Sequence, residues 1–378
     1  MTLLIAARSC SDPSLEPPAP TKISPPTALA AAAPVAGDFV DIISSGGLDQ
    51  VDLSAIAAVN TTAGTRSMVI DRATLEMARI TRHGTTIIAS PPGEFFPMDT
   101  VGLHDAVPSG ASQVIFDPTL QSGAIVLSRT SAAVERAAAG DEVEIRAWDG
   151  TLHTFVIGAV VDDEDIADAE IAIDATIGSL LGVSRPSRVR VWGTRSALDA
   201  MRSTLPINLV TVASWEPTSP DETISQARTK QLLGQFAYAR DISGQIAIDP
   251  AWKAANLVTQ KIPLIGTIEC HRVVAQAAAA ALDELRQAGL ARLIDTNDTY
   301  HNGGCWGPRE QKTSDGTNGR TLSRHSWGAA IDVNPTANPQ GATPNMDPRI
   351  IAAFRNHGFA WGGTFPTPDG MHFEYTGP

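Results

Sequence analysis

Three residues near the C-terminus have the types and order of a catalytic metal site. His325 stands seven residues before Asp332 in the stretch SRHSWGAAIDVN, and His372 follows forty residues later in DGMHFEY. A catalytic zinc ion takes three protein ligands of the His and carboxylate type and keeps a fourth position open for water. A nearby carboxylate can then take a proton from that water and pass it to a leaving amine. The three residues are therefore candidate ligands of a hydrolytic zinc site.

The surrounding pattern resembles the D-alanyl-D-alanine carboxypeptidase family of zinc metallopeptidases, which includes vancomycin-resistance dipeptidases and phage endolysin peptidases. The resemblance covers about the last 110 residues. The family segment Ser-x-His-x-x-Gly-x-Ala-x-Asp is matched at Ser323, His325, Gly328, Ala330 and Asp332. By this resemblance His325, Asp332 and His372 bind Zn²⁺, and Asp369 is the general base three residues before the second histidine. Many members have Glu where this chain has Asp369.

Two alternatives concern the residues that assist the metal. Glu374 competes as the base, because alternation along a strand points it to the same face as His372, but it lacks the family spacing and we prefer Asp369. In the family an arginine upstream of the first histidine orients the substrate and stabilises the oxyanion. Arg309, in TYHNGGCWGPR, takes that place and Arg320 is the alternative. A guanidinium binds a carboxylate or a developing oxyanion through paired hydrogen bonds.

The elements that must position these residues indicate an α+β domain over residues 240–378. Residues 273–287 are rich in Ala and Leu and are followed by Gly289, as is typical of a helix and its C-cap. A second helix is predicted between an N-cap at Asp347, with Pro348 in the first turn, and Gly358. Residues 329–333 and 371–375 fit strands. We expect a small antiparallel sheet with flanking helices.

Residues 38–235 are predicted to form a β-rich extracytoplasmic domain. Strands are indicated at 112–118 and 123–128, a helix at 131–139, and a hairpin whose Asp149-Gly150 pair suits a type I′ turn. Residues 123–161 resemble the extracytoplasmic core domains of certain bacterial transporter permeases, which suggests a spacing or binding module with an envelope or transporter partner. The histidines outside the ligand set lack metal-ligand spacing and are expected to be structural. They are His83, His104, His153, His271, His301 and His357.

The N-terminal residues 1–37 have the composition of an exported tether. A short apolar run precedes Cys10, a candidate for lipidation, and a Pro- and Ala-rich stretch predicted to be disordered follows it; the alternative is a tail without function. No apolar run is long enough for a transmembrane helix. Cys270 and Cys305 are an even pair that an oxidising compartment would join, whereas two reduced thiols would be expected in a cytosolic protein.

Charge and chemistry together favour a peptidase of the cell envelope. The net charge of -13 argues against a nucleic-acid partner, since phosphate binding depends on Lys and Arg. We expect an exported enzyme, extracellular or in the envelope with Cys10 as its candidate lipid anchor, that cuts peptidoglycan peptides as a carboxypeptidase or an endopeptidase. The alternative from another class is a zinc-stabilised module that binds peptidoglycan without cutting it. The presence of Asp369 favours the enzyme.

Overall fold

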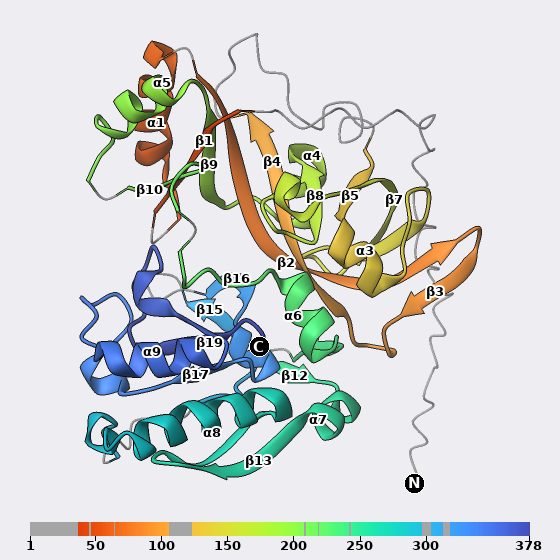
Figure 1. The fold of residues 1–378 in the computed structure, drawn as a ribbon. Helices are drawn as coiled ribbons and strands as arrows, with labels where there is room; N and C mark the ends of the chain where they lie inside the picture. The colour runs from red at the N-terminus through yellow and green to blue at the C-terminus, as the bar shows by residue number, and fades with distance from the viewer. Residues whose placement is uncertain are drawn as a thin grey trace, which may run out of the picture.

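A computed structural model describes residues 37–44, 47–63, 65–105, 123–207, 209–217, 219–241, 243–296, 304–312 and 318–378. Cys10, the predicted tether and the strand predicted at 112–118 lie outside these residues. Figure 1 shows a large sheet with its helices at the top and a helix-rich unit below it. Both parts contain helices and strands, and most neighbouring strands are antiparallel, so the α+β class expected from the sequence is confirmed.

The upper part is built on a mixed ten-stranded sheet, with strand order β10-β1-β9-β2-β4-β8-β5-β7-β6 and β3 paired to β2. Its strands are β1 (Phe39–Ile43), β2 (Arg66–Arg82), β3 (Thr85–Ala89), β4 (Phe96–Asp105), β5 (Ile125–Ser128), β6 (Glu142–Arg146), β7 (Leu152–Val161), β8 (Ile171–Asp174), β9 (Pro186–Trp192) and β10 (Val210–Ala213). The long β2 pairs with β9 in its first half and with β6 and β3 in its second half. Its pairing with β6 closes a ring of six strands, β2-β4-β8-β5-β7-β6.

In the part of the chain that the structure describes, the helices against this sheet are α1 (Gln50–Ala63), α3 (Arg129–Glu135), α4 (Ala175–Leu181) and α5 (Arg195–Arg202). The helix predicted at 131–139 is shorter and begins earlier, because Arg136 adopts a left-handed conformation that ends it. The predicted hairpin forms between β6 and β7, but the prediction of a type I′ turn is wrong. Arg146 pairs with Leu152, and only Gly150 of the two turn residues has positive φ, so the loop is wider.

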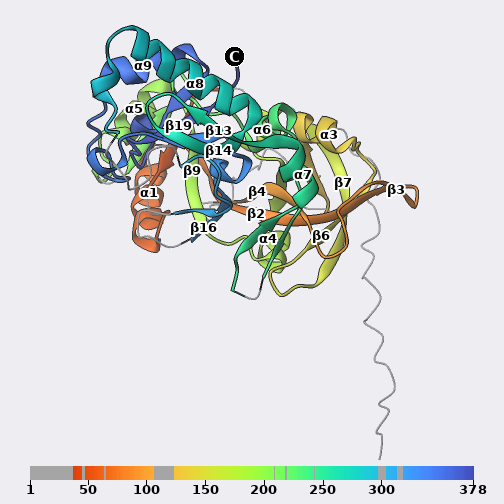
Figure 2. The same cartoon turned by 90° about the horizontal axis from the view of Figure 1, so that it is seen from below.

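The lower unit has its own core, formed by residues from Leu233 to Tyr375. Its elements are α6 (Gln226–Leu233), β11 (Tyr238–Arg240), β12 (Ile246–Ile248), α7 (Pro250–Asn256), β13 (Leu257–Ile262), β14 (Gly266–His271), α8 (Arg272–Gln287), β15 (Glu310–Lys312), β16 (Asn318–Leu322), β17 (Ala330–Asp332), α9 (Pro348–Asn356), β18 (Phe359–Trp361) and β19 (His372–Tyr375). Seen from below, α8 and β13 lie in front and β2 runs behind them toward β3 (Figure 2).

The two helices predicted for this unit are present as α8 and α9. Gly289 has φ of 72° just beyond α8, which only glycine adopts without strain. The carboxylate of Asp347 accepts from the N–H of Arg349 at 2.9 Å and caps α9, while Pro348 occupies the first turn. The predicted strands are β17 and β19, and they form an antiparallel sheet in the order β17-β19-β18.

Helix α6 joins the two parts through buried charges. The ammonium of Lys230 lies 2.8 Å from Glu170 at the start of β8 and 3.5 Å from Glu135 of α3, and all three side chains are fully buried. Gln226 donates to Glu170 at 2.6 Å. Removing one member of such a group leaves an unpaired buried charge, which costs about 3–5 kcal/mol. The sheet and the lower unit are therefore held in a defined arrangement.

A disulfide joins Cys270 at the end of β14 to Cys305, with 5.3 Å between their Cα atoms. The pairing expected from the sequence is confirmed. It ties the loop that carries Arg309 to the core of the lower unit. Among the described residues, no helix is long and apolar enough to cross a membrane.

Candidate active site

The structure brings His325, Asp332 and His372 together in one triangle. The Nε2 atom of His325 lies 3.3 Å from Nδ1 of His372 and 3.5 Å from Oδ1 of Asp332, and the last two atoms are 3.4 Å apart. A tetrahedral ion with ligand bonds of about 2.0–2.2 Å keeps its ligand atoms about 3.3–3.6 Å apart. Oδ1 of Asp332 is buried without a hydrogen bond. The three residues therefore fit a metal ion, and they are the one such group found within the described ranges.

The pairing of two short strands explains this proximity. Asp332 ends β17 and is directly opposite His372, which begins β19. Directly opposed residues project to the same face of a sheet with their Cβ atoms about 5 Å apart. His325 comes from the preceding 3₁₀ turn, η3 (Arg324–Trp327), whose N-cap is Ser323. The sequence motif thus encodes a cap, a turn and a strand, which together bring His325 and Asp332 close to each other.

Gly328 is needed where η3 turns into β17. Its φ is 62°, and a Cβ atom placed on it would lie 2.5 Å from the backbone nitrogen of His271. The same close approach allows the N–H of His271 to donate to the Gly328 carbonyl at 3.2 Å. Because Gly328 has no side chain, the turn that carries His325 packs directly against β14, the strand that contributes one cysteine of the disulfide.

Replacing Gly328 with alanine is expected to destabilise the protein by about 2–4 kcal/mol, from left-handed strain and from the clash with the backbone. Gly341 is a matched control, because its φ is 82° but nothing lies within 4 Å of its added Cβ atom. Chemical denaturation of both variants would measure the difference. Equal losses of stability for Gly328→Ala and Gly341→Ala would contradict the close approach.

The ligand atoms are oriented by contacts behind them. Nδ1 of His325 donates to the carbonyl of Cys305 at 2.9 Å, which leaves Nε2 as the free lone pair of the neutral ring. Nε2 of His372 faces Glu374 at 3.6 Å, and Glu374 in turn accepts from Arg324 at 3.2 Å. Both imidazoles are thus turned with one nitrogen toward the triangle and the other toward an oxygen acceptor.

The electrostatics of the triangle favour a positive charge at its centre. Burial lowers the pKa of His325. Burial also acts to lower the pKa of His372, but Asp332 and Glu374 outweigh it and raise that pKa to about 10. Although burial opposes ionisation of Asp332, the two imidazoles hold the pKa of this carboxyl far below its usual range. A metal ion can supply the same charge once the proton has left.

Asp369 and Arg309 lie in the same cavity as the triangle. The cavity has a volume of about 590 Å³. Oδ1 of Asp369 is buried without a hydrogen-bond partner, and burial raises the pKa of this carboxyl to about 6 despite the opposing effect of His372. A pKa near neutrality suits a general base. Partial burial lowers the pKa of Arg309, against the attraction of Asp332 and Asp369.

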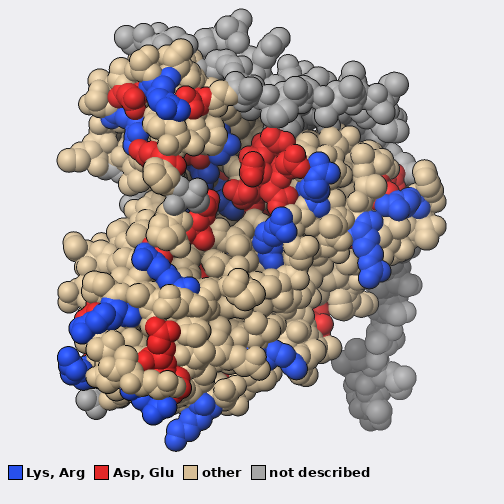
Figure 3. Space-filling view, in the orientation of Figure 1, with Lys and Arg blue, Asp and Glu red and all other residues tan. Residues whose placement is uncertain are grey.

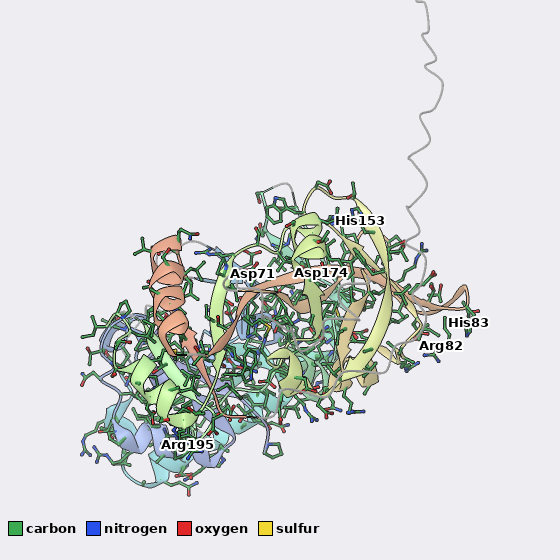
Figure 4. The ribbon with its side chains drawn as sticks, turned by 90° about the horizontal axis from the view of Figure 1, so that it is seen from above. Asp71, Arg82, His83, His153, Asp174 and Arg195 are labelled. Atoms are coloured by element: carbon green, nitrogen blue, oxygen red, sulfur yellow. A yellow bond between two sulfur atoms is a disulfide. The ribbon has the colours of Figure 1, made fainter. Side chains whose placement is uncertain are left out.

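The other histidines whose side chains the structure describes lie outside the site. His83 lies in the β2–β3 turn and His153 lies on β7, and Figure 4 shows them apart from each other. His271 caps α8 and contacts the Leu233 carbonyl at 3.1 Å, and His357 pairs with Glu284 at 3.0 Å. His301 and the side chains of His104 and Arg320 are outside the described part of the structure.

Several cavity residues have no signal in the C-terminal motifs. Arg72 and Asp99 come from β2 and β4 of the upper sheet, and Gln226 comes from α6. Alternation along β2 places Arg72 on the same face as Thr74 and Glu76, which meet the lower unit: the N–H of Leu322 donates to Thr74 at 3.1 Å, and Arg240 pairs with Glu76. The active cavity is therefore formed by both parts of the chain.

A cavity that holds a possible His/Asp/His metal site beside a carboxylate of raised pKa is typical of a metal-dependent hydrolase. Residues 317–375 match the family model described as D-alanyl-D-alanine carboxypeptidase. The match contains all three candidate ligands and Asp369, and it shows that the C-terminal segment is similar to a peptidase family. It excludes Arg309 and the upper sheet. The comparison with curated proteins gives no match.

Proposed function

We propose that this protein hydrolyses peptide bonds of bacterial peptidoglycan stem peptides, with a zinc ion held by His325, Asp332 and His372. The observation that carries the proposal is the triangle of ligand atoms 3.3–3.5 Å apart in the cavity that Asp369 lines. The family match supports the peptidase class and its cell-wall substrate. The proposal covers both a carboxypeptidase and an endopeptidase.

Different residues of the cavity would perform different parts of the reaction. When bound, the zinc ion lowers the pKa of a water molecule and polarises the scissile carbonyl. The carboxylate of Asp369 accepts the proton of the attacking water and delivers it to the leaving amine. The guanidinium of Arg309 binds the terminal carboxylate or the developing oxyanion.

Glu374 is better placed to support His372 than to act as the base. It faces the nitrogen of His372 that points away from the triangle, and its other oxygen pairs with Arg324. A carboxylate behind a metal-bound imidazole fixes the ring and raises its basicity. The role of general base therefore falls to Asp369.

We also propose that the chain works outside the cytoplasm. A disulfide persists in oxidising compartments, and the Cys270–Cys305 bond is consistent with export. Lipidation at Cys10, and an envelope or transporter partner for residues 38–235, remain proposals carried by the sequence.

The decisive experiment incubates the full-length protein with purified muropeptides and analyses the products by mass spectrometry. We expect loss of a residue or fragment that stops with a chelator and returns when Zn²⁺ is added. The mass of the product identifies the bond. Tight binding of one zinc ion and of muropeptides without any change in mass would replace the enzyme with the non-catalytic binding module.

A further inference from the structure

The cavity that contains Asp369 and the triangle, here the catalytic cavity, continues along the upper sheet. A pocket of about 220 Å³ shares Arg72, Gln311 and Thr321 with the catalytic cavity and extends to Arg188 of β9. One cleft therefore leads from Asp369, in the lower unit, to Arg188, in the upper one. Figure 3 shows Lys and Arg side chains in the recess between the two parts of the molecule, beside a patch of Asp and Glu.

Strand register places the two arginines on one wall. Arg188 is directly opposite Ile70 of β2, and Arg72 lies two residues further along that strand on the same face. Each guanidinium is held by a buried carboxylate. Asp41 lies 2.9 Å from Arg188, and Asp99 binds Arg72 through both of its oxygens. The arginines are thus oriented before any ligand arrives.

Arg188 uses only part of its hydrogen-bonding capacity within the protein. Arg190 binds Asp41 with two hydrogen bonds, at 2.8 and 3.0 Å, and Arg188 shares the same carboxylate through Nη1 alone. Nε and Nη2 of Arg188 have no hydrogen-bond partner in the described part of the chain. Burial and the neighbouring charges of Arg72 and Arg190 lower the pKa of Arg188, against the effect of Asp41 and Asp168. The site therefore has guanidinium donors that are free to bind a ligand.

We propose that Arg188, with Arg72 beside it, binds a carboxylate of the substrate peptide that lies away from the scissile bond. The planar guanidinium matches a carboxylate through two parallel hydrogen bonds. The inference rests on the proposed function, because it assigns a second anchoring point to the same peptide. In this arrangement Arg309 serves the end of the peptide that is cut, and the upper sheet selects its distal part.

The test uses two N-acetylated pentapeptides, L-Ala-γ-D-Glu-L-Lys-D-Ala-D-Ala and its form with the D-Glu α-carboxylate amidated. The bond to be cut is the same in both. Charge-assisted hydrogen bonds predict that the full-length protein prefers the acid by about 10- to 100-fold in kcat/KM. Arg188→Gln is expected to reduce the acid-to-amide ratio of kcat/KM to about threefold or less. Arg188→Lys should give an intermediate ratio, because lysine keeps the charge but lacks the planar guanidinium that makes two parallel hydrogen bonds.

Arg195 provides the control in the same part of the protein. Its guanidinium pairs with Asp38 and is largely exposed, and Figure 4 shows it at the far end of the upper unit from His153. Arg195→Gln should therefore preserve the wild-type ratio. Thermal melts and zinc content of each variant verify folding and the metal site. Equal losses with both peptides, at an unchanged ratio, would overturn the subsite.

A binding measurement separates this inference from the proposed function. Fluorescence anisotropy compares labelled acid and amide peptides on the Asp369→Asn protein, with and without Arg188→Gln. If wild type cuts neither peptide, the carboxypeptidase form of the proposed function fails, and binding alone decides the subsite. Tighter binding of the acid that Arg188→Gln abolishes supports the anion site, whereas equal affinities for acid and amide refute it.

Discussion

Replacing His372 with alanine is expected to abolish both zinc binding and turnover. His372 supplies one of the three candidate ligand atoms, and its position opposite Asp332 completes the triangle. Two remaining ligands cannot enforce the geometry of a catalytic zinc site. Metal analysis after dialysis should fall from one zinc ion per chain to a trace, and muropeptide hydrolysis should fall to the background rate.

His357→Ala is the matched control for this prediction. It removes an imidazole from the same unit, where His357 pairs with Glu284 at the end of α9 and outside the cavity. Zinc content and turnover should stay at the wild-type level. Retention of one tightly bound zinc ion in both His372→Ala and His325→Ala would place the metal elsewhere and remove the basis of the proposed chemistry.

Replacing Asp369 with asparagine should separate catalysis from metal binding. The amide has nearly the same shape as the carboxyl but cannot accept the proton from the attacking water. General bases contribute about 10²–10⁴-fold to rates, so kcat should fall by that factor while the zinc content is unchanged. Steady-state kinetics on muropeptides and metal analysis of the same preparation measure the two quantities.

Glu374→Gln distinguishes the two candidate bases. Because Glu374 contacts the outer nitrogen of His372, its loss should weaken zinc binding by about 10- to 100-fold and leave kcat near wild type at saturating zinc. The reverse result, with full activity in Asp369→Asn and none in zinc-saturated Glu374→Gln, would transfer the role of base to Glu374.

The ligand set could be predicted from the sequence because its determinants are local. The segment from Ser323 to Asp332 contains its own cap, its glycine with positive φ and its strand, so its spacing brings two of the candidate ligands together, and the third enters through the pairing of β17 with β19. The helix capped by Asp347 and the helix that ends before Gly289 could also be predicted from the sequence. An N-cap carboxylate and a C-terminal glycine act on residues only a few positions away.

The features that the sequence did not reveal depend on contacts between distant segments. Arg72 is one of several arginines in a strand with no special pattern, and it becomes a cavity residue only because β2 packs against β16. Lys230 would be expected on a helix surface, yet it is fully buried between two glutamates. The turn at Gly150 is wider than predicted because Asp149 accepts from both the N–H and the hydroxyl of Thr151.

The disulfide has a consequence for the entropy of the unfolded chain. It joins residues separated by 35 positions. A crosslink across a loop of that size lowers the conformational entropy of the unfolded state and so raises its free energy by roughly 3–4 kcal/mol. Cys305 is also the residue whose carbonyl orients His325. Oxidation of the two thiols therefore removes part of the ordering cost that metal binding would otherwise have to overcome, and the first ligand is held in a prepared orientation.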